Sequence, residues 1–193
     1  VPMLPNANRG QLAQCAARNF NSYINTLAVN LKNAGAGNAI LRIGWEADGN
    51  SFPWIATGDG STYRGCFIQW VTTLRAVSPN FTIVWNMSAK AKYAGSINNL
   101  YPGNEYVDVI ATERYDRCIS IRTQADWNST VNAVIGYGNP AGVGSWLAFA
   151  KSKGKKLAFG EWGVSNADKV NLTFAEAKSA LEQGLVRTLI GIF

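Results

Sequence analysis

The sequence predicts an α/β protein with a parallel sheet, and more specifically a partial (β/α)8 (TIM) barrel holding about strands 4 to 8, without the early strands. Three observations lead to this prediction. Short apolar runs alternate with longer segments whose apolar residues recur at helical spacing. Each apolar run releases polar residues at its end, as strands do at the active face of a barrel. No glycine-rich phosphate loop follows any run, which argues against a nucleotide-binding doubly wound sheet.

The strands and helices follow from these patterns in chain order. Apolar runs predict five strands, at Ala39–Glu46, Phe81–Asn86, Tyr106–Ala111, Leu157–Glu161 and Leu185–Phe193. Helical spacing predicts helices at Gln11–Ala34, Tyr63–Val77, around Trp146–Ser152 and at Phe174–Gln183. The helix at Tyr63–Val77 has Phe67, Trp70 and Leu74 on one face and stops at a Ser-Pro pair. We expect Trp70, Trp85 and Trp146 to pack in the core.

Composition limits the chemistry that the 193 residues can perform. The chain has no histidine, so nucleophile systems built on histidine and His-ligated metal sites are excluded. Acid–base chemistry must therefore rest mainly on the 12 carboxylates. We expect no metal and no cofactor. The three cysteines, Cys15, Cys66 and Cys118, allow one disulfide and one free thiol, and the sequence does not choose the pair.

The net charge of +6 invites a nucleic-acid reading, which the distribution of the charge does not favour. The one dense basic run, Lys151 to Lys156, follows a predicted helix and is typical of a solvated face. No stretch reaches the ~18 consecutive apolar residues of a membrane-spanning helix. We therefore expect neither nucleic acid nor membrane as a partner.

Polar residues gather where the predicted strands end, at Glu46, Asn86, Glu113–Asp116 and Glu161. Because side chains alternate along a strand, Arg42 shares a face with Glu46 and points into the barrel below it. A buried arginine needs a partner, and Asp108 on a neighbouring strand is the expected one.

Two of these glutamates lie beside tryptophan, in Gly44-Trp45-Glu46 and Glu161-Trp162-Gly163, and a loop of small polar and aromatic residues follows Glu46. Aromatic faces stack on sugar rings, and carboxylates and carboxamides bind hydroxyl groups. Hydrolysis of a glycosidic bond needs two carboxyl groups on one cleft, one as general acid and one as nucleophile or base. An apolar wall raises the pKa of the acid and keeps it protonated.

Three ordered motifs resemble glycoside hydrolase family 26, the β-mannanase family of (β/α)8 barrels. They are Ile40–Trp54, Tyr101–Ile110 with Tyr115-Asp116, and Gly154–Gly163. The resemblance implies a retaining mechanism with Glu46 as acid/base and Glu161 as nucleophile. It places Tyr115 near the nucleophile and makes Trp54 and Trp162 sugar-stacking walls.

The resemblance has departures. Many members carry histidine where this chain has Trp45, and a tryptophan where it has Ser51. The likeness fades after Val164, so residues 1–193 are expected to be one bacterial catalytic domain that is truncated at its N-terminus and divergent after about residue 164. The predicted substrate-binding residues are Trp45, Asn50, Trp54, Asn86, Tyr115 and Trp162; Asn86 either contacts sugar or caps its strand.

The predicted function is a secreted, monomeric, retaining and endo-acting hydrolase of β-1,4-mannan-type polysaccharide. A β-glucan (lichenan-type) or xylan hydrolase on the same scaffold is the first alternative. The second is a carbohydrate-binding barrel remnant without catalysis. Retention of both strand-end glutamates favours an enzyme, because binding alone does not require the pair.

Overall fold

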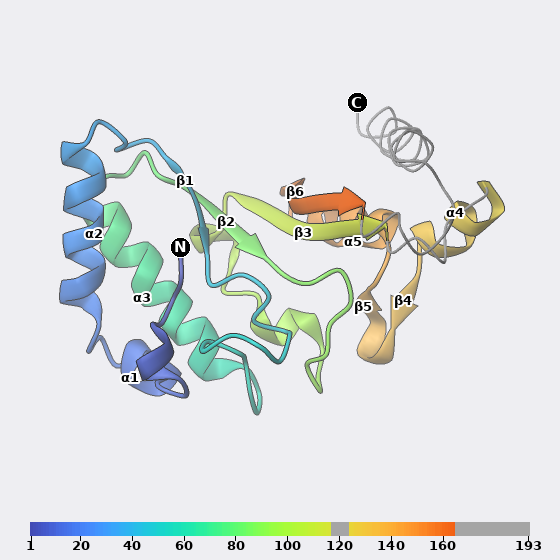
Figure 1. Ribbon diagram of the computed structural model, residues 1–193, viewed down its shortest axis with the longest axis horizontal. Coiled ribbons are helices and arrows are strands. Elements are labelled where there is room, and N and C mark those ends of the chain that lie inside the picture. Colours follow the sequence, from blue (N-terminus) through green and yellow to red (C-terminus); the bar gives the residue numbers. More distant parts are fainter. Residues whose placement is uncertain (117–123, 165–193) are drawn as a thin grey trace.

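A computed structural model describes residues 1–116 and 124–164 of the chain (Figure 1). Its main sheet has the order β1-β2-β3-β6, and every neighbouring pair is parallel. The strands are β1 (Ile40–Ile43), β2 (Thr82–Asn86), β3 (Val109–Asp116) and β6 (Lys156–Val164). Chain order and sheet order agree, as they do in successive units of a barrel, so the predicted parallel α/β architecture is confirmed.

Helices precede or follow these strands in the chain. They are α1 (Leu12–Ala16), α2 (Asn21–Asn33), α3 (Ser61–Val77), α4 (Gln124–Val131) and α5 (Val143–Ser152). A short hairpin of β4 (Val134–Ile135) and β5 (Asn139–Pro140) lies before α5. Figure 1 shows α1, α2 and α3 grouped at one side of the sheet, and the hairpin beyond its opposite end. Between β2 and β3 the chain forms only 3-10 turns, Ile97–Leu100 and Asn104–Tyr106.

The prediction of one helix over Gln11–Ala34 is wrong, whereas that of a helix over Tyr63–Val77 is confirmed by α3. The chain breaks between α1 and α2 at Arg18, whose φ of 74° is incompatible with a continuous α-helix. A disulfide between Cys15 and Cys66 links α1 to α3. It settles the pairing that the sequence left open, and Cys118 lies outside the described residues.

The core lies between the sheet and the helices. Trp70, Trp85 and Trp146 are each at most 1% exposed, which confirms their predicted place. Trp85 on β2 meets Tyr101 edge to face at 5.2 Å and stacks on Phe149 of α5 at 6.0 Å. These large rings fix β2 and α5 against each other, and with them the strand ends that carry the polar residues.

Strand boundaries differ from the prediction on either side of the sheet. β1 ends at Ile43 rather than Glu46, because Gly44 and Glu46 take left-handed φ values of 50° and 51° that no strand allows. β3 begins at Val109 and continues to Asp116, beyond the predicted end at Ala111. The predicted elements at Phe174–Gln183 and Leu185–Phe193 lie outside the described residues. Among the described residues no helix is long and apolar enough to span a membrane.

Candidate active site

Polar residues from the strand ends lie together, and several of them line one cavity. Glu113 of β3 lies directly opposite Glu161 of β6 in the parallel register. A cavity of about 530 Å³ opens beside them and is lined by Glu46, Glu113 and Tyr115 among others. The structure thus brings together acidic side chains from three different strand ends on one face, as the sequence pattern predicted.

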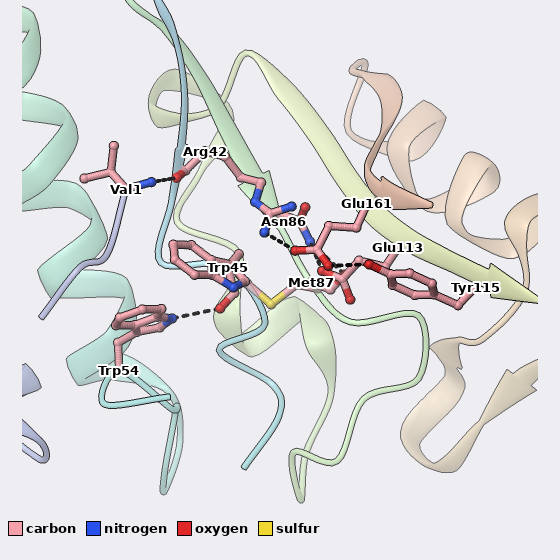
Figure 2. Close-up of polar contacts among 9 residues, drawn as sticks. All are labelled: Val1, Arg42, Trp45, Trp54, Asn86, Met87, Glu113, Tyr115 and Glu161. Atoms are coloured by element: carbon pink, nitrogen blue, oxygen red, sulfur yellow. Dashed lines mark hydrogen bonds and ion pairs between the residues drawn. The ribbon is translucent and has the colours of Figure 1, made fainter. Parts of the chain in front are cut away.

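Glu161 is held by two partners, as Figure 2 shows. The guanidinium of Arg42 forms an ion pair with Oε1, and the Tyr115 hydroxyl donates to Oε2 at 2.8 Å. The hydrogen bond from Arg42 is the largest influence on the pKa of Glu161, and with the Tyr115 hydroxyl it outweighs desolvation and lowers that pKa. Glu161 is therefore poised as a carboxylate. The expected position of Tyr115 beside the nucleophile candidate is confirmed.

The expected partner of Arg42 was wrong. Asp108 instead accepts two hydrogen bonds from Arg75, both at 3.0 Å, and one from the Ile83 amide at 2.7 Å. Asp108 precedes the first residue of β3, at the N-terminal edge of the sheet, whereas Arg42 reaches toward the C-terminal edge, where Glu161 lies. The sequence spacing indicated that Arg42 needs an acidic partner, but it did not indicate the direction in which the long Arg42 side chain extends.

Arg42 is itself fixed from two sides. Its guanidinium carbon lies 5.1 Å from the centre of the Trp45 ring, and its backbone carbonyl accepts a hydrogen bond from the amino group of Val1. Gly160 leaves space for this arrangement: a β-carbon there would lie 1.8 Å from Asn86 Oδ1 and 2.8 Å from Arg42 Nη1. A side chain at Gly160 would therefore displace both groups.

Glu113 is one of the polar residues at the predicted strand ends, and the sequence assigned it no role in the site. Its side chain is buried, at 4% exposed, and accepts a hydrogen bond from Asn86 Nδ2 at 2.9 Å. Burial is the largest cause that raises its pKa to about 9, and a hydrogen bond with the side chain of Glu46 is the second. Glu113 thus carries a proton at neutral pH. The available signal was its period-two spacing from Tyr115 in the same strand.

Glu46 stands where the chain leaves β1. Its amide donates to the Asn86 carbonyl at 3.0 Å, and its own carbonyl accepts from the Gly49 amide at 2.9 Å. Its φ of 51° places a non-glycine residue in the left-handed region, a form of strain that collects at functional sites. Asn86 thus positions both glutamates: its backbone carbonyl accepts from the Glu46 amide, and its side-chain amide donates to Glu113.

The predicted stacking role of Trp54 is wrong in this structure. Trp54 is only 3% exposed, lies parallel to Phe52 at 5.0 Å, and donates its indole N–H to the Trp45 carbonyl at 2.8 Å. Packing of the loop, rather than contact with a ligand, accounts for its position. Trp162 is 56% exposed and pairs with Arg114 in the register, on the strand face opposite to Glu161, so its sugar contact stays a prediction.

The remaining predicted binding residues divide between cavity and framework. Asn50 lines the cavity. Asn86 is buried and bonded to Glu113 and to the Met87 carbonyl, which makes it a framework residue rather than an exposed sugar contact. Trp45 is partly buried beneath Arg42.

The sequence model of glycosyl hydrolase family 26 matches residues 11–159. The chain belongs to this family. Its fold resembles the catalytic domain of an endo-β-1,4-mannanase from Bacillus sp. JAMB-750, at 23% identity and a TM-score of 0.61 over 86% of this chain and 44% of that one. It also resembles the family 26 domain of an endo-β-mannanase/endo-β-glucanase from Prevotella bryantii, at 20% identity and a TM-score of 0.52 over 83% and 46%. A search of curated proteins finds no match.

Membership of family 26 indicates that the four-stranded sheet is part of a (β/α)8 barrel. The structural neighbours are (β/α)8 barrels, which confirms the predicted fold class, and the chain spans less than half of the length of each of the two structures described above. In such barrels the active site lies at the C-terminal ends of the strands. The cluster of Glu46, Glu113 and Glu161 occupies that face of this family 26 chain.

Proposed function

We propose that this chain carries the catalytic centre of a retaining, endo-acting glycoside hydrolase that cleaves β-1,4-mannan-type polysaccharide. One observation carries the proposal: Glu161 is held as a carboxylate by Arg42 and Tyr115, while its neighbour Glu113, which lines the cavity together with Glu46 and Tyr115, keeps a proton. A retaining mechanism requires an ionised nucleophile and a proton donor, and the proton of Glu113 reaches the cavity through the hydrogen bond between Glu113 and Glu46.

In the first step the Glu161 carboxylate attacks the anomeric carbon and forms a glycosyl ester. The bond to the leaving oxygen breaks, and Glu46 transfers its proton to that oxygen. In the second step Glu46, now a carboxylate, takes a proton from water as the water attacks the anomeric carbon. The ester bond breaks, and Glu161 returns to its ionised form with the anomeric configuration retained.

The assignment of the acid to Glu46 rather than Glu113 follows from access. Glu46 is partly exposed on the cavity, whereas Glu113 is buried and bonded to Asn86. Glu113 therefore acts as a positioning residue that shares its proton with Glu46. Tyr115 orients the nucleophile and donates to the carboxylate oxygen that does not bear the arginine.

Family membership and the names of the neighbouring structures support a mannan-type substrate and internal cleavage. Secretion is part of the proposal, because a polysaccharide is reached outside the cell, and the Cys15–Cys66 disulfide supports an oxidising compartment. A monomer is likewise part of the proposal.

Release of reducing ends from galactomannan, lichenan, barley β-glucan and xylan tests the proposal, with Glu161→Gln protein alongside. We expect release from the mannan only, abolished in the variant, and a ladder of oligosaccharides as products. Release of reducing ends from a β-glucan or from xylan alone would show that this polymer, and not mannan, is the substrate. Binding of mannan without any release would identify a carbohydrate-binding protein and overturn the catalytic assignment.

A further inference from the structure

The cavity has a basic edge that the hydrolysis of a neutral polymer does not use. Lys90 and Lys92 both line it, on the loop that follows β2, together with Asn50 and Ser51 of the loop that follows Glu46. We infer that this edge binds an anionic substituent of the polysaccharide, a carboxylate being the simplest, so that the preferred substrate is an acidic β-mannan-type glycan. This inference rests on the proposed function and names its substrate more narrowly.

The loop that carries the lysines is held in place by its backbone. Asp48 Oδ1 accepts hydrogen bonds from the Ser88 amide at 2.9 Å and the Ser88 hydroxyl at 2.6 Å, and the Asp48 carbonyl accepts from the Lys92 amide at 2.9 Å. The indole N–H of Trp146 donates to the Ala89 carbonyl at 3.3 Å. Lys90 and Lys92 therefore project from a backbone that is already ordered, which lowers the cost of binding.

Asp48 is a buried framework group rather than a counter-charge at the cavity. Its side chain is fully buried, and desolvation is the largest cause that raises its pKa to about 6. Its side-chain carboxylate accepts hydrogen bonds from Ser88 and from neither lysine ammonium group. The lysine ammonium groups are thus left to act on whatever enters the cavity.

The charged side chains that line the cavity are three cations, Lys90, Lys92 and Arg114, and two carboxyl groups, Glu46 and Glu113, so the balance favours an anion. Glu113 keeps its proton, so this carboxyl brings no negative charge at neutral pH, and Glu161 is neutralised by Arg42. Lys92 donates to the carboxamide oxygen of Asn50 at 3.3 Å, which satisfies one N–H and leaves the charge unpaired. Within residues 1–116 and 124–164, neither the ion pair Arg42–Glu161 nor the ion pair Arg75–Asp108 involves Lys90 or Lys92.

A neutral sugar gains little from two such cations, because its hydroxyls are served equally well by serine and asparagine. A carboxylate gains charge-assisted hydrogen bonds from both ammonium groups. Two lysines separated by one residue on an ordered loop can approach the two oxygens of one carboxylate or two acidic units of a chain. The chemistry that this edge recognises is therefore an acidic group on the glycan.

The test compares one polymer in two charge states. Soluble galactomannan is used as such and after oxidation of part of its 6-hydroxyl groups to carboxylates, and binding to the full chain with Glu161→Gln is measured by titration calorimetry. We expect about tenfold tighter binding of the oxidised polymer at low salt. The preference shrinks as salt rises, because the screening length falls from about 10 Å at 0.1 M to about 3 Å at 1 M.

Two charge-reversed variants separate the edge from the basic character of the whole chain. Lys90→Glu/Lys92→Glu is expected to remove the preference, whereas Lys151→Glu/Lys156→Glu, at exposed lysines that do not line the cavity, is expected to keep it. Thermal unfolding followed by circular dichroism tests whether both variants fold. If Lys90→Glu/Lys92→Glu does not fold, Lys90→Gln/Lys92→Gln takes its place.

Equal binding of both polymers, or an equal loss in both charge-reversed variants, would overturn the inference. Hydrolysis of the unoxidised polymer by the unsubstituted chain is scored separately and reports on the proposed function. If the chain hydrolyses galactomannan but shows no preference for the oxidised polymer, the inference is wrong and the proposed function stands. A chain that hydrolyses neither polymer and binds neither would lose both.

Discussion

Glu113 and Glu161 are direct neighbours in the sheet, on adjacent parallel strands and at the same level, yet they are driven to opposite protonation states. The pKa of Glu161 is lowered and that of Glu113 is raised to about 9. Glu161 has a guanidinium and a phenol as partners, whereas Glu113 has an amide and a second carboxyl. The two residues share their level in the sheet, and the deeper burial of Glu113 together with the different partner side chains makes the difference.

This contrast shows how one face of the sheet can keep one glutamate protonated and its neighbour ionised. Arg42 extends from β1 to Glu161 and lowers the pKa of that residue. Burial beside Glu46 raises the pKa of Glu113. The ionised Glu161 and the protonated Glu113 can each be replaced by glutamine, which preserves the shape of the side chain. The predictions below run from the largest expected effect to the smallest.

Glu161→Gln removes the carboxylate that is proposed as the nucleophile. Because glutamine cannot form the glycosyl ester, we expect kcat to fall by about 10⁴-fold or more on any substrate that the chain hydrolyses. Initial rates of reducing-end release measure this. Glu105→Gln, the same change at an exposed glutamate away from the cavity, serves as the control and should retain full activity. Comparable activity of both variants would exclude Glu161 as nucleophile.

Glu46→Gln removes the proton donor and later the general base. We expect kcat on polysaccharide to fall by about 10² to 10⁴-fold. The loss should be much smaller in the first step for an aryl mannoside with a good leaving group, since such a group departs without protonation. Burst kinetics with the aryl substrate measure that step. An equal loss on both substrates would argue against Glu46 as the acid.

Glu113→Gln keeps the shape of the buried side chain and removes its titration. Without the second carboxyl, the shared proton is lost at lower pH, so the alkaline limb of the pH–rate profile should move toward acid by about one unit or more. The profile of kcat/KM from pH 4 to 10 measures the shift. An unchanged alkaline limb would separate Glu113 from the acid.

The same substitution changes how stability depends on pH. The pKa of Glu113 lies at about 9 in the folded chain against an ordinary value of 4.5, so the folded state holds this proton more tightly than the unfolded state. Its contribution to stability is therefore complete below pH 4.5 and is lost as pH rises toward 9. Glu113→Gln should flatten that decline in urea unfolding. A decline as steep as in the unsubstituted chain would contradict the burial of a protonated Glu113.

Tyr115→Phe weakens the hold on Glu161 and leaves Arg42 in place. Loss of the phenolic hydrogen bond should raise the pKa of Glu161 modestly, because Arg42 is the larger influence. The acidic limb of the profile should then move up by a few tenths of a unit, with kcat about tenfold lower. Tyr137→Phe, at an exposed tyrosine away from the cavity, should change neither. A shift of the alkaline limb instead would place Tyr115 on the acid's side of the site.

Sequence patterns predicted the parallel sheet and the gathering of glutamates, because both follow from the period of apolar residues and from where strands end. They did not predict the partner of Arg42, because the direction of a long side chain is set by three-dimensional packing. They misplaced Trp54, since an aromatic residue in a loop looks the same whether it faces a ligand or Phe52. The importance of Glu113 was hidden because burial beside Glu46 arises only in the fold.

Covalent trapping tests the central claim most directly. A 2-deoxy-2-fluoro mannosyl fluoride slows the hydrolysis of the ester intermediate, so incubation with the chain and peptide mass spectrometry reveals the residue that attacks. The account predicts a single fluoromannosyl adduct on the peptide that contains Glu161, and none in Glu161→Gln. An adduct on Glu46 or Glu113, or turnover that inverts the anomeric configuration without an adduct, would contradict it.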